Sequence, residues 1–323
     1  MAAAIRFALI FISVLAVANV NAAERIRLAV QKTGTLAWEL DVVQTHGLDR
    51  KLDLAIETLQ LASTEAAKVA LRAGSVDLML SDWLWVARER SLGDNIVFYP
   101  LSSAVGAVMT PAQSSIRDVV DLKHKKLAVA GGPLDKSWLL LRAYALRAGV
   151  DLTKDATIVY GAPPLLSQKA LQEETEATLT YWNFCADLES KGFKRAIDLQ
   201  DIIRGLGAKG PVGMLGYAFN GDWAKRNAST VDRLLEATRS AKEILVSSEP
   251  EWQRLAATIR IGDANALAIY RQRYSEGILR RSLAQEETDT RTLYGVLVDI
   301  GGRELVGPAR ELPPGTFYSP TSE

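Results

Sequence analysis

Apolar residues follow two patterns along the chain, short apolar or alternating runs and longer stretches with apolar residues three and four positions apart. The short runs predict strands and the longer stretches predict amphipathic helices. The predicted strands are 26–30, 54–61, 76–80, 96–101, 103–109, 127–130, 157–160, 177–183 and 210–219. The predicted helices are 36–45, 66–73, 86–95, 136–147, 162–173, 229–247, 249–259, 264–275 and 286–301. Because strands and helices alternate, we expect an α/β protein with parallel, doubly wound sheets.

The strand, turn and helix pattern restarts near residue 102, which predicts a second domain. The run 210–219 reads as a return strand with glycines suited to a hinge. We therefore expect a discontinuous first lobe from 23–102 and 215–323, and a second lobe from 103–214.

The stretch 69–85 carries the strongest candidate for a binding site. A helix stopped by Gly74 leads into a short apolar strand and then into the loop Ser81, Asp82, Trp83, Leu84 and Trp85. Ligands of open α/β sheets collect at the carboxyl ends of strands, so a carboxylate and two tryptophans there form a candidate binding lip. In the alternative, the tryptophans are core residues and Asp82 caps a helix.

Similar polar and aromatic clusters follow three other predicted strands. Lys32, Thr33, Thr35 and Trp38 follow the first strand, although Thr35 alone would also serve as a helix cap. Gly131 and Gly132 precede another helix, where backbone N–H groups face an anion or simply form a tight turn. Tyr181, Trp182 and Asn183 end the strand 177–183.

Composition narrows the class of protein. The chain has 323 residues, of which 48% are hydrophobic and 24% charged, so it is an ordinary globular chain long enough for two domains. Its 38 basic residues equal its 38 acidic ones, which removes the electrostatic case for nucleic-acid binding.

The first 22 residues predict export. Arg6 precedes an apolar run from residue 7 to 18, and small residues end at Ala22, as a signal peptidase requires. A membrane anchor is the alternative, but the run is short for a span.

The single cysteine, Cys185, cannot form an internal disulfide and is expected to be a buried small hydrophobe. An exported chain without disulfides indicates the bacterial periplasm, and two histidines, His46 and His124, make a zinc site improbable.

At this point the chain resembles a known family, the periplasmic solute-binding proteins of ABC importers in the nitrate, sulfonate, taurine and thiamine-precursor (NMT1-like) group. The resemblance covers nearly all of the mature chain. It rests on the order and spacing of the segments 26–38, 70–77, 121–129, 139–150 and 181–183. It implies a two-lobed type II binding-protein fold, each lobe a mostly parallel sheet flanked by helices, joined by two hinge strands with the ligand in the cleft between the lobes.

The resemblance also implies ligand contacts and partners. The residues at the family's binding positions are Thr33, Gly34, Trp38, Asp82, Trp83, Asp135, Ser137, Tyr181, Trp182 and Asn183. Asp82 and Asp135 depart from the neutral donors that hold anions in the family, because two carboxylates repel an anion. We therefore expect a zwitterionic, cationic or aromatic small molecule, with Lys32 or Lys136 offsetting one carboxylate. The expected partners are an ABC permease and ATPase, and we expect a monomer without cofactor or metal.

Two alternatives stay open from the sequence. A pyrimidine-precursor synthase shares the expected fold, but the histidine set and cysteine cluster of that enzyme are missing here, so we expect no catalysis. A periplasmic accessory or sensor protein of a redox system would keep the fold and bind a protein partner, since fold alone does not decide function.

Overall fold

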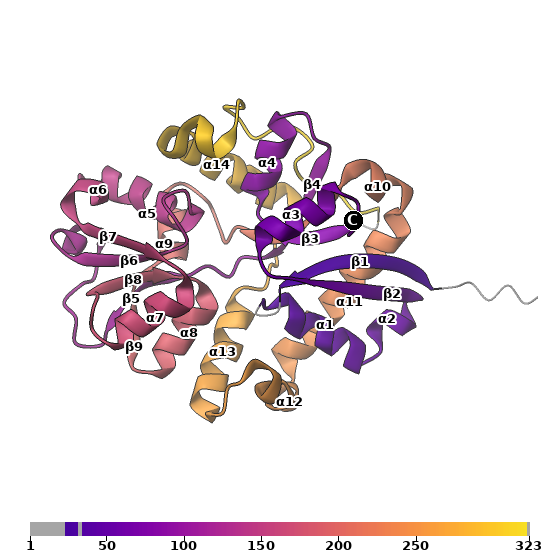
Figure 1. Cartoon of the computed structure of the whole chain (residues 1–323), viewed down its shortest axis with the longest axis horizontal. Helices are drawn as coiled ribbons and strands as arrows, with labels where there is room; N and C mark the ends of the chain where they lie inside the picture. The colour runs from indigo at the N-terminus through magenta and orange to yellow at the C-terminus, as the bar shows by residue number, and fades with distance from the viewer. Residues whose placement is uncertain (1–22, 32–33, 322–323) are drawn as a thin grey trace, which may run out of the picture.

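The computed structural model of the protein describes residues 23–31 and 34–321. It contains two lobes, each built on a five-stranded sheet (Figure 1). The strand orders are β2-β1-β3-β10-β4 in the first sheet and β7-β6-β8-β5-β9 in the second. This confirms the two-lobed α/β fold that the sequence predicts.

The first sheet combines strands from both ends of the chain. Its strands are β1 (Glu24–Gln31), β2 (Leu54–Leu61), β3 (Leu78–Ser81), β4 (Ile96–Ser102) and β10 (Leu215–Asn220). β1 runs parallel to β2 and β3, whereas β10 runs antiparallel to β3 and β4. The associated helices are α1 (Leu36–Thr45), α2 (Leu48–Lys51), α3 (Thr64–Arg72), α4 (Trp83–Ser91), α10 (Gly221–Arg226) and α11 (Ala228–Ser247).

The second sheet is formed by one continuous part of the chain. Its strands are β5 (Ala107–Pro111), β6 (Lys126–Ala130), β7 (Thr157–Gly161), β8 (Ala177–Thr180) and β9 (Phe193–Asp198). β6 is parallel to β7 and β8, and β5 is antiparallel to β8 and β9. The associated helices are η1 (Val119–Leu122), α5 (Lys136–Arg147), α6 (Leu152–Asp155), α7 (Pro163–Leu171), α8 (Trp182–Ser190) and α9 (Leu199–Gly205).

Two chain segments connect the sheets, residues 103–106 and 206–214. The first passes close to the end of β8, because a Cβ on Gly106 would lie 1.5 Å from the Thr180 carbonyl oxygen. Ser103 is also tied to the turn after the last residues of α13, its backbone N–H donating to the Gly277 carbonyl at 3.0 Å. Such close approaches require glycine and fix the path of the first connection.

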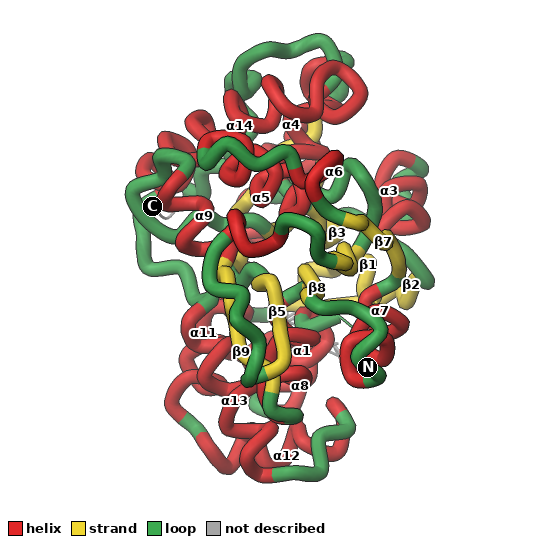
Figure 2. Tube along the Cα trace, turned by 90° about the vertical axis from the view of Figure 1, so that its left-hand side faces the viewer, coloured by secondary structure: helices red, strands yellow, loops and turns green. Residues whose placement is uncertain are grey.

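Three C-terminal helices follow α11, and the last two of them join the lobes a second time. These are α12 (Glu249–Ile259), α13 (Ala264–Glu276) and α14 (Leu283–Val306). α13 packs against α8 as well as α11, and α14 packs against both α4 and α5 (Figure 2). Leu293 and Leu297 of α14 belong to the same buried cluster as Trp85 of α4 and Leu139 of α5, so apolar core runs from one lobe to the other. The division into 23–102 with 215–323 and 103–214 stays a prediction.

Several predicted segments differ from the structure. Residues 177–183 are a strand only to Thr180, since Tyr181 caps α8, and residues 83–85 begin α4 instead of forming a loop. The predicted strand 103–109 starts at Ala107, and 210–219 starts at Leu215, because the preceding residues cross between the lobes. Helix α14 extends to Val306 through a kink at Gly302. By contrast, the structure has α1, α12 and β2 at their predicted bounds.

The predicted signal sequence, residues 1–22, lies outside the described residues. Among the described residues, none of the helices has the length and apolar character needed to cross a membrane.

Candidate functional site

Three helices start at strand ends that face the boundary between the lobes. Asp82 is the N-cap of α4 and accepts a hydrogen bond from the Trp85 backbone N–H at 2.9 Å. Asp135 is the N-cap of α5 and accepts from the Ser137 N–H at 2.9 Å. Tyr181 is the N-cap of α8 without a capping side-chain bond. The two carboxylates therefore satisfy the helix starts at which an anion would otherwise bind.

An ion pair crosses from one lobe to the other at these helix starts. The Lys136 ammonium, on the first residue of α5, donates to Asp82 Oδ2 at 3.2 Å. Tyr181 Oη donates to Asp135 Oδ2 at 3.1 Å within the second lobe. The Asp82 and Lys136 side chains are 28% and 23% exposed, so the pair is half-buried. The geometry thus brings Asp82, Asp135, Lys136 and Tyr181 into one cluster.

The charges in this cluster reinforce each other. Burial opposes the charged form of Asp82, but the Lys136 ammonium and the Trp85 N–H together lower the pKa of that carboxyl below its usual value. Burial likewise opposes the Lys136 ammonium, yet Asp82 and Asp135 raise its pKa. Burial, Asp135 and Asp82 together raise the pKa of Tyr181, so it keeps its proton and remains a donor. Asp82 and Lys136 are both charged at neutral pH.

Aromatic side chains form a second contact between the lobes. The ring of Trp182, on α8, lies with its centroid 6.0 Å from that of Trp38 on α1, at an interplanar angle of 79°. Tyr270 and Tyr274 of α13 lie 6.2 and 6.3 Å from Trp182. Trp252 of α12 lies 6.1 Å from Trp38. The pair with Tyr274 is tilted and the other three are edge-to-face, a favoured geometry for aromatic pairs.

Buried polar atoms without partners accompany the strand ends. Within the described part of the chain, Ser81 Oγ, Trp83 Nε1 and Thr180 Oγ1 have no hydrogen-bond partner. Ser81 ends β3 and Thr180 ends β8, directly before Asp82 and Tyr181. A buried polar group without a partner costs free energy, so these three atoms are available to a water or ligand group that reaches the strand ends.

The ten residues predicted from the sequence occupy different environments. Asp82, Asp135, Tyr181, Trp38 and Trp182 lie in the two interlobe contacts. The Trp83 ring is fully buried in the core, as in the alternative in which Asp82 is a helix cap. The others are Gly34, Ser137 and Asn183, which are half-buried, and Thr33, which lies outside the described residues.

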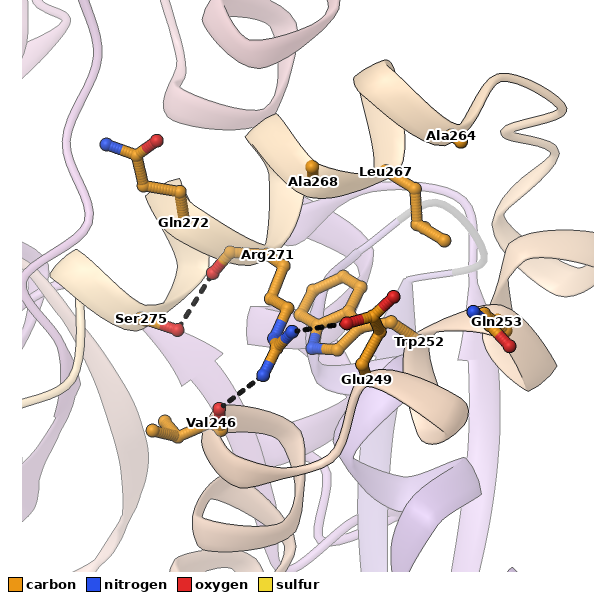
Figure 3. A pocket seen from close by; sticks show the side chains of 10 residues that line it. All are labelled: Val246, Glu249, Trp252, Gln253, Ala264, Leu267, Ala268, Arg271, Gln272 and Ser275. Atoms are coloured by element: carbon orange, nitrogen blue, oxygen red, sulfur yellow. Dashed lines mark hydrogen bonds and ion pairs between the residues drawn. The ribbon is translucent and has the colours of Figure 1, made fainter.

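A separate hollow of about 480 Å³ lies between α12, α13 and the end of α11 (Figure 3). Arg271 spans it, with its guanidinium 3.6 Å from Glu249 Oε2 and hydrogen-bonded to the Val246 carbonyl at 3.3 Å. Its apolar lining includes Trp252 and Leu267. None of the nine predicted site residues that the structure describes lines this hollow.

Three residues of the interlobe contacts were not among the ten. The sequence predicts Lys136 only as a counter-charge to a carboxylate, and it predicts Tyr270 and Tyr274 as core residues of a helix. The sequence does contain a signal for the role of Lys136, because a cation at the start of a helix opposes the helix dipole and needs a nearby anion. Nothing in the local sequence shows that α13 returns to α8 of the second lobe.

Comparison with known proteins places the chain in a family. The NMT1/THI5-like family model matches residues 42–251, which is more than half of the chain. The chain belongs to the NMT1/THI5-like family. The matched region of this family member runs from α1 to α12 and includes Asp82, Lys136 and Tyr181. No curated protein matches this family member in sequence.

Solved structures with the same fold include binding proteins. The NMT1/THI5-like chain is similar to the periplasmic aliphatic sulphonate binding protein SsuA from Escherichia coli, with a TM-score of 0.72, 20% identity and coverage of 92% of this chain and 93% of that one. It is also similar to the alkanesulfonate-binding protein SsuA from Xanthomonas axonopodis pv. citri bound to MOPS, with a TM-score of 0.69, 17% identity and coverage of 91% and 98%.

The same fold is found in an enzyme. The desulfurization enzyme DSZB is 11% identical, with a TM-score of 0.60 and coverage of 92% of this chain and 97% of that one. At these identities the likeness shows the fold, and the chemistry must be argued from the residues of this family member.

Proposed function

We propose that the protein is an exported solute-binding protein that captures a small organic molecule between its lobes and delivers it to an ABC importer. The observation that carries this proposal is the meeting of strand ends from both sheets at one boundary, joined by the Asp82 and Lys136 pair. Polar groups from two lobes that converge in this way suit a site that closes around a ligand. The predicted signal sequence supports a periplasmic location.

The proposed contacts have two kinds of chemistry. Trp38 and Trp182 offer aromatic surface for the organic part of the ligand. Asp82, Asp135 and Tyr181 offer polar groups, while Ser81 and Thr180 contribute buried hydroxyls. The remaining predicted contacts, Thr33, Gly34, Trp83, Ser137 and Asn183, belong to the same proposal. The similarity in fold to two sulfonate-binding proteins supports binding as the activity.

The proposal is tested on the mature protein purified from the periplasm of its host. Native mass spectrometry of the protein shows a bound small molecule if one copurifies, and a thermal-shift panel of sulfonates, amino acids, polyamines and heteroaromatic amines finds others. A ligand at one hundred times its dissociation constant stabilises the folded state by about 2.7 kcal/mol. Loss of uptake of that ligand on deletion of the gene supports delivery to an importer, and unchanged uptake contradicts it.

A further inference from the structure

We propose that Lys136 and Asp82 together select the charge of the ligand, favouring a molecule that carries both a cationic and an anionic group. The inference rests on the proposed function and deepens it. It assigns Lys136 as a specificity-determining residue, which the sequence named only as a possible counter-charge.

The placement of Lys136 supports a role beyond stability. It occupies the first residue of α5, where the positive end of the helix dipole disfavours a cation. Its ammonium reaches Asp82 Oδ2, on a different lobe and 54 residues away in the sequence. Separating the lobes therefore breaks this pair, and any ligand that enters at the helix starts meets both charges.

The neighbouring charges are already engaged within their own lobes. Asp135 accepts hydrogen bonds from the Ser137 N–H and from Tyr181 Oη, so its charge faces the start of α5. Lys68 lies near Asp82 but pairs with Glu65 at 2.7 Å and covers the Trp85 ring. Among the described residues at these helix starts, the Asp82 and Lys136 pair thus remains as the charge contact between the two lobes.

The balance of this pair decides which ligand charge is accepted. An anion that binds the Lys136 ammonium leaves the half-buried Asp82 carboxylate without a counter-charge. A cation that binds Asp82 leaves the Lys136 ammonium without a counter-charge. Removing one partner of a buried pair is costly because the other charge remains uncompensated. A ligand with both charges replaces both partners at once, so neither charge is left alone.

The experiment uses three probes of equal chain length with the full mature protein: 4-aminobutanoate, butanoate and butylamine. Their dissociation constants are measured by ligand-observed NMR for the wild type, Lys136→Met and Asp82→Asn. Asparagine retains the helix-cap acceptor of α4, and methionine retains the length of the lysine stem. Lys154→Met and Asp201→Asn remove equal charges from exposed pairs elsewhere and serve as controls.

We expect the wild type to bind 4-aminobutanoate about tenfold more tightly than either singly charged probe, because only this probe pairs with both charges. A tenfold difference corresponds to about 1.4 kcal/mol in binding free energy. Lys136→Met exposes an unpaired carboxylate, so its preference shifts about tenfold towards butylamine. Asp82→Asn shifts the preference by a similar factor towards butanoate. The controls keep the wild-type order.

Unchanged charge preference in both variants, or no binding of any probe to them, overturns the inference, with circular dichroism melts showing that the variants fold. This result differs from failure of the proposed function. If the charge preference switches as expected but deletion of the gene affects no uptake, the charge selection is supported and the transport function is rejected. If a ligand copurifies and neither substitution changes its binding, solute binding is supported and charge selection is rejected.

Discussion

At the scale of single residues, buried charges in the first lobe depend on few partners. Glu39 of α1 is buried and its Oε1 accepts from the Lys242 ammonium and from Tyr274 Oη, the latter at 2.9 Å. The other oxygen, Oε2, has no hydrogen-bond partner among the described residues. This pair joins α1 to α11 at the residue that follows Trp38 in the sequence.

Lys242→Met tests the dependence of Glu39 on its partner. We expect a loss of about 3–5 kcal/mol in the free energy of unfolding, because a buried carboxylate loses its counter-charge. The measurement is urea denaturation followed by circular dichroism. The double variant Glu39→Gln with Lys242→Met recovers most of the lost stability, since no buried charge remains. Lys154→Met, which removes an 81% exposed lysine, is the control and changes stability by less than about 1 kcal/mol.

A second buried carboxyl makes stability depend on pH. Burial raises the pKa of Glu286, and Asp289 adds to that shift, while the Gly213 N–H and Arg281 oppose it. The folded state therefore holds the Glu286 proton more tightly than the unfolded chain does. The group favours folding when it is protonated, and this contribution is lost as the pH rises from the unfolded value of 4.5 through the raised folded value.

Glu286→Gln removes this dependence. An amide at this position still accepts from the Gly213 N–H and carries no charge, so we expect the variant to gain stability over the wild type as pH rises above 4.5. Denaturant midpoints between pH 4 and 8 measure the difference. Glu287→Gln, which removes a more exposed carboxylate paired with Arg291, is the control. A constant difference across this range would show that Glu286 does not titrate differently on folding.

At the scale of elements, two of the three glycines of α14 have different backbone conformations. Gly302 has φ of 59° and ψ of −163°, a region that only glycine adopts readily, and it kinks the helix. Gly295 has helical φ and ψ and, like Gly302, has open space where a Cβ would lie. The two positions therefore separate backbone conformation from steric fit.

Alanine substitutions at the two positions have opposite expected effects. Gly302→Ala destabilises the protein by about 1–3 kcal/mol, because alanine is strained in this conformation. Gly295→Ala stabilises it by about 0.4–1 kcal/mol, because alanine restricts the unfolded chain and favours helix. Thermal unfolding of both variants measures these effects. If Gly302→Ala proved as stable as Gly295→Ala, the kink would not require glycine.

At the scale of the whole molecule, the lobes are held together by aromatic side chains as well as by charge. Trp182 contacts Trp38 of the first lobe and both Tyr270 and Tyr274 of α13. Each such pair contributes about 0.5–1.5 kcal/mol beyond its buried area. Removing one ring therefore weakens three contacts at the boundary between the lobes.

Trp182→Ala is expected to broaden and lengthen the distances between the lobes. Double electron–electron resonance between nitroxide labels on Lys51→Cys and Lys154→Cys measures this distance. Cys185 does not interfere, because burial raises the pKa of its thiol to about 12. The control Trp223→Ala removes a ring that contacts Phe219 within the first lobe, so it leaves the interlobe distance unchanged. Equal distances in all three proteins would show that Trp182 does not hold the lobes together.

The sequence by itself determined the local elements and the fold class. The spacing of apolar residues within β2 and α12 is a property of each segment alone, so the bounds of both elements followed from that pattern. The caps of Asp82 and Asp135 are also local, because each carboxylate bonds to a backbone N–H two or three residues ahead. The restart of the strand and helix pattern near residue 102 indicated a second sheet.

Only the tertiary structure decided which of these elements meet. Lys136 pairs with Asp82 from 54 residues away, and Tyr274 bonds to Glu39 from 235 residues away. Periodicity shows which face of α13 is apolar but not that this face turns towards α8 of the other lobe. The reason is physical: hydrophobic burial is not directional, so the apolar pattern of one helix fits many partners and the complete packing selects one.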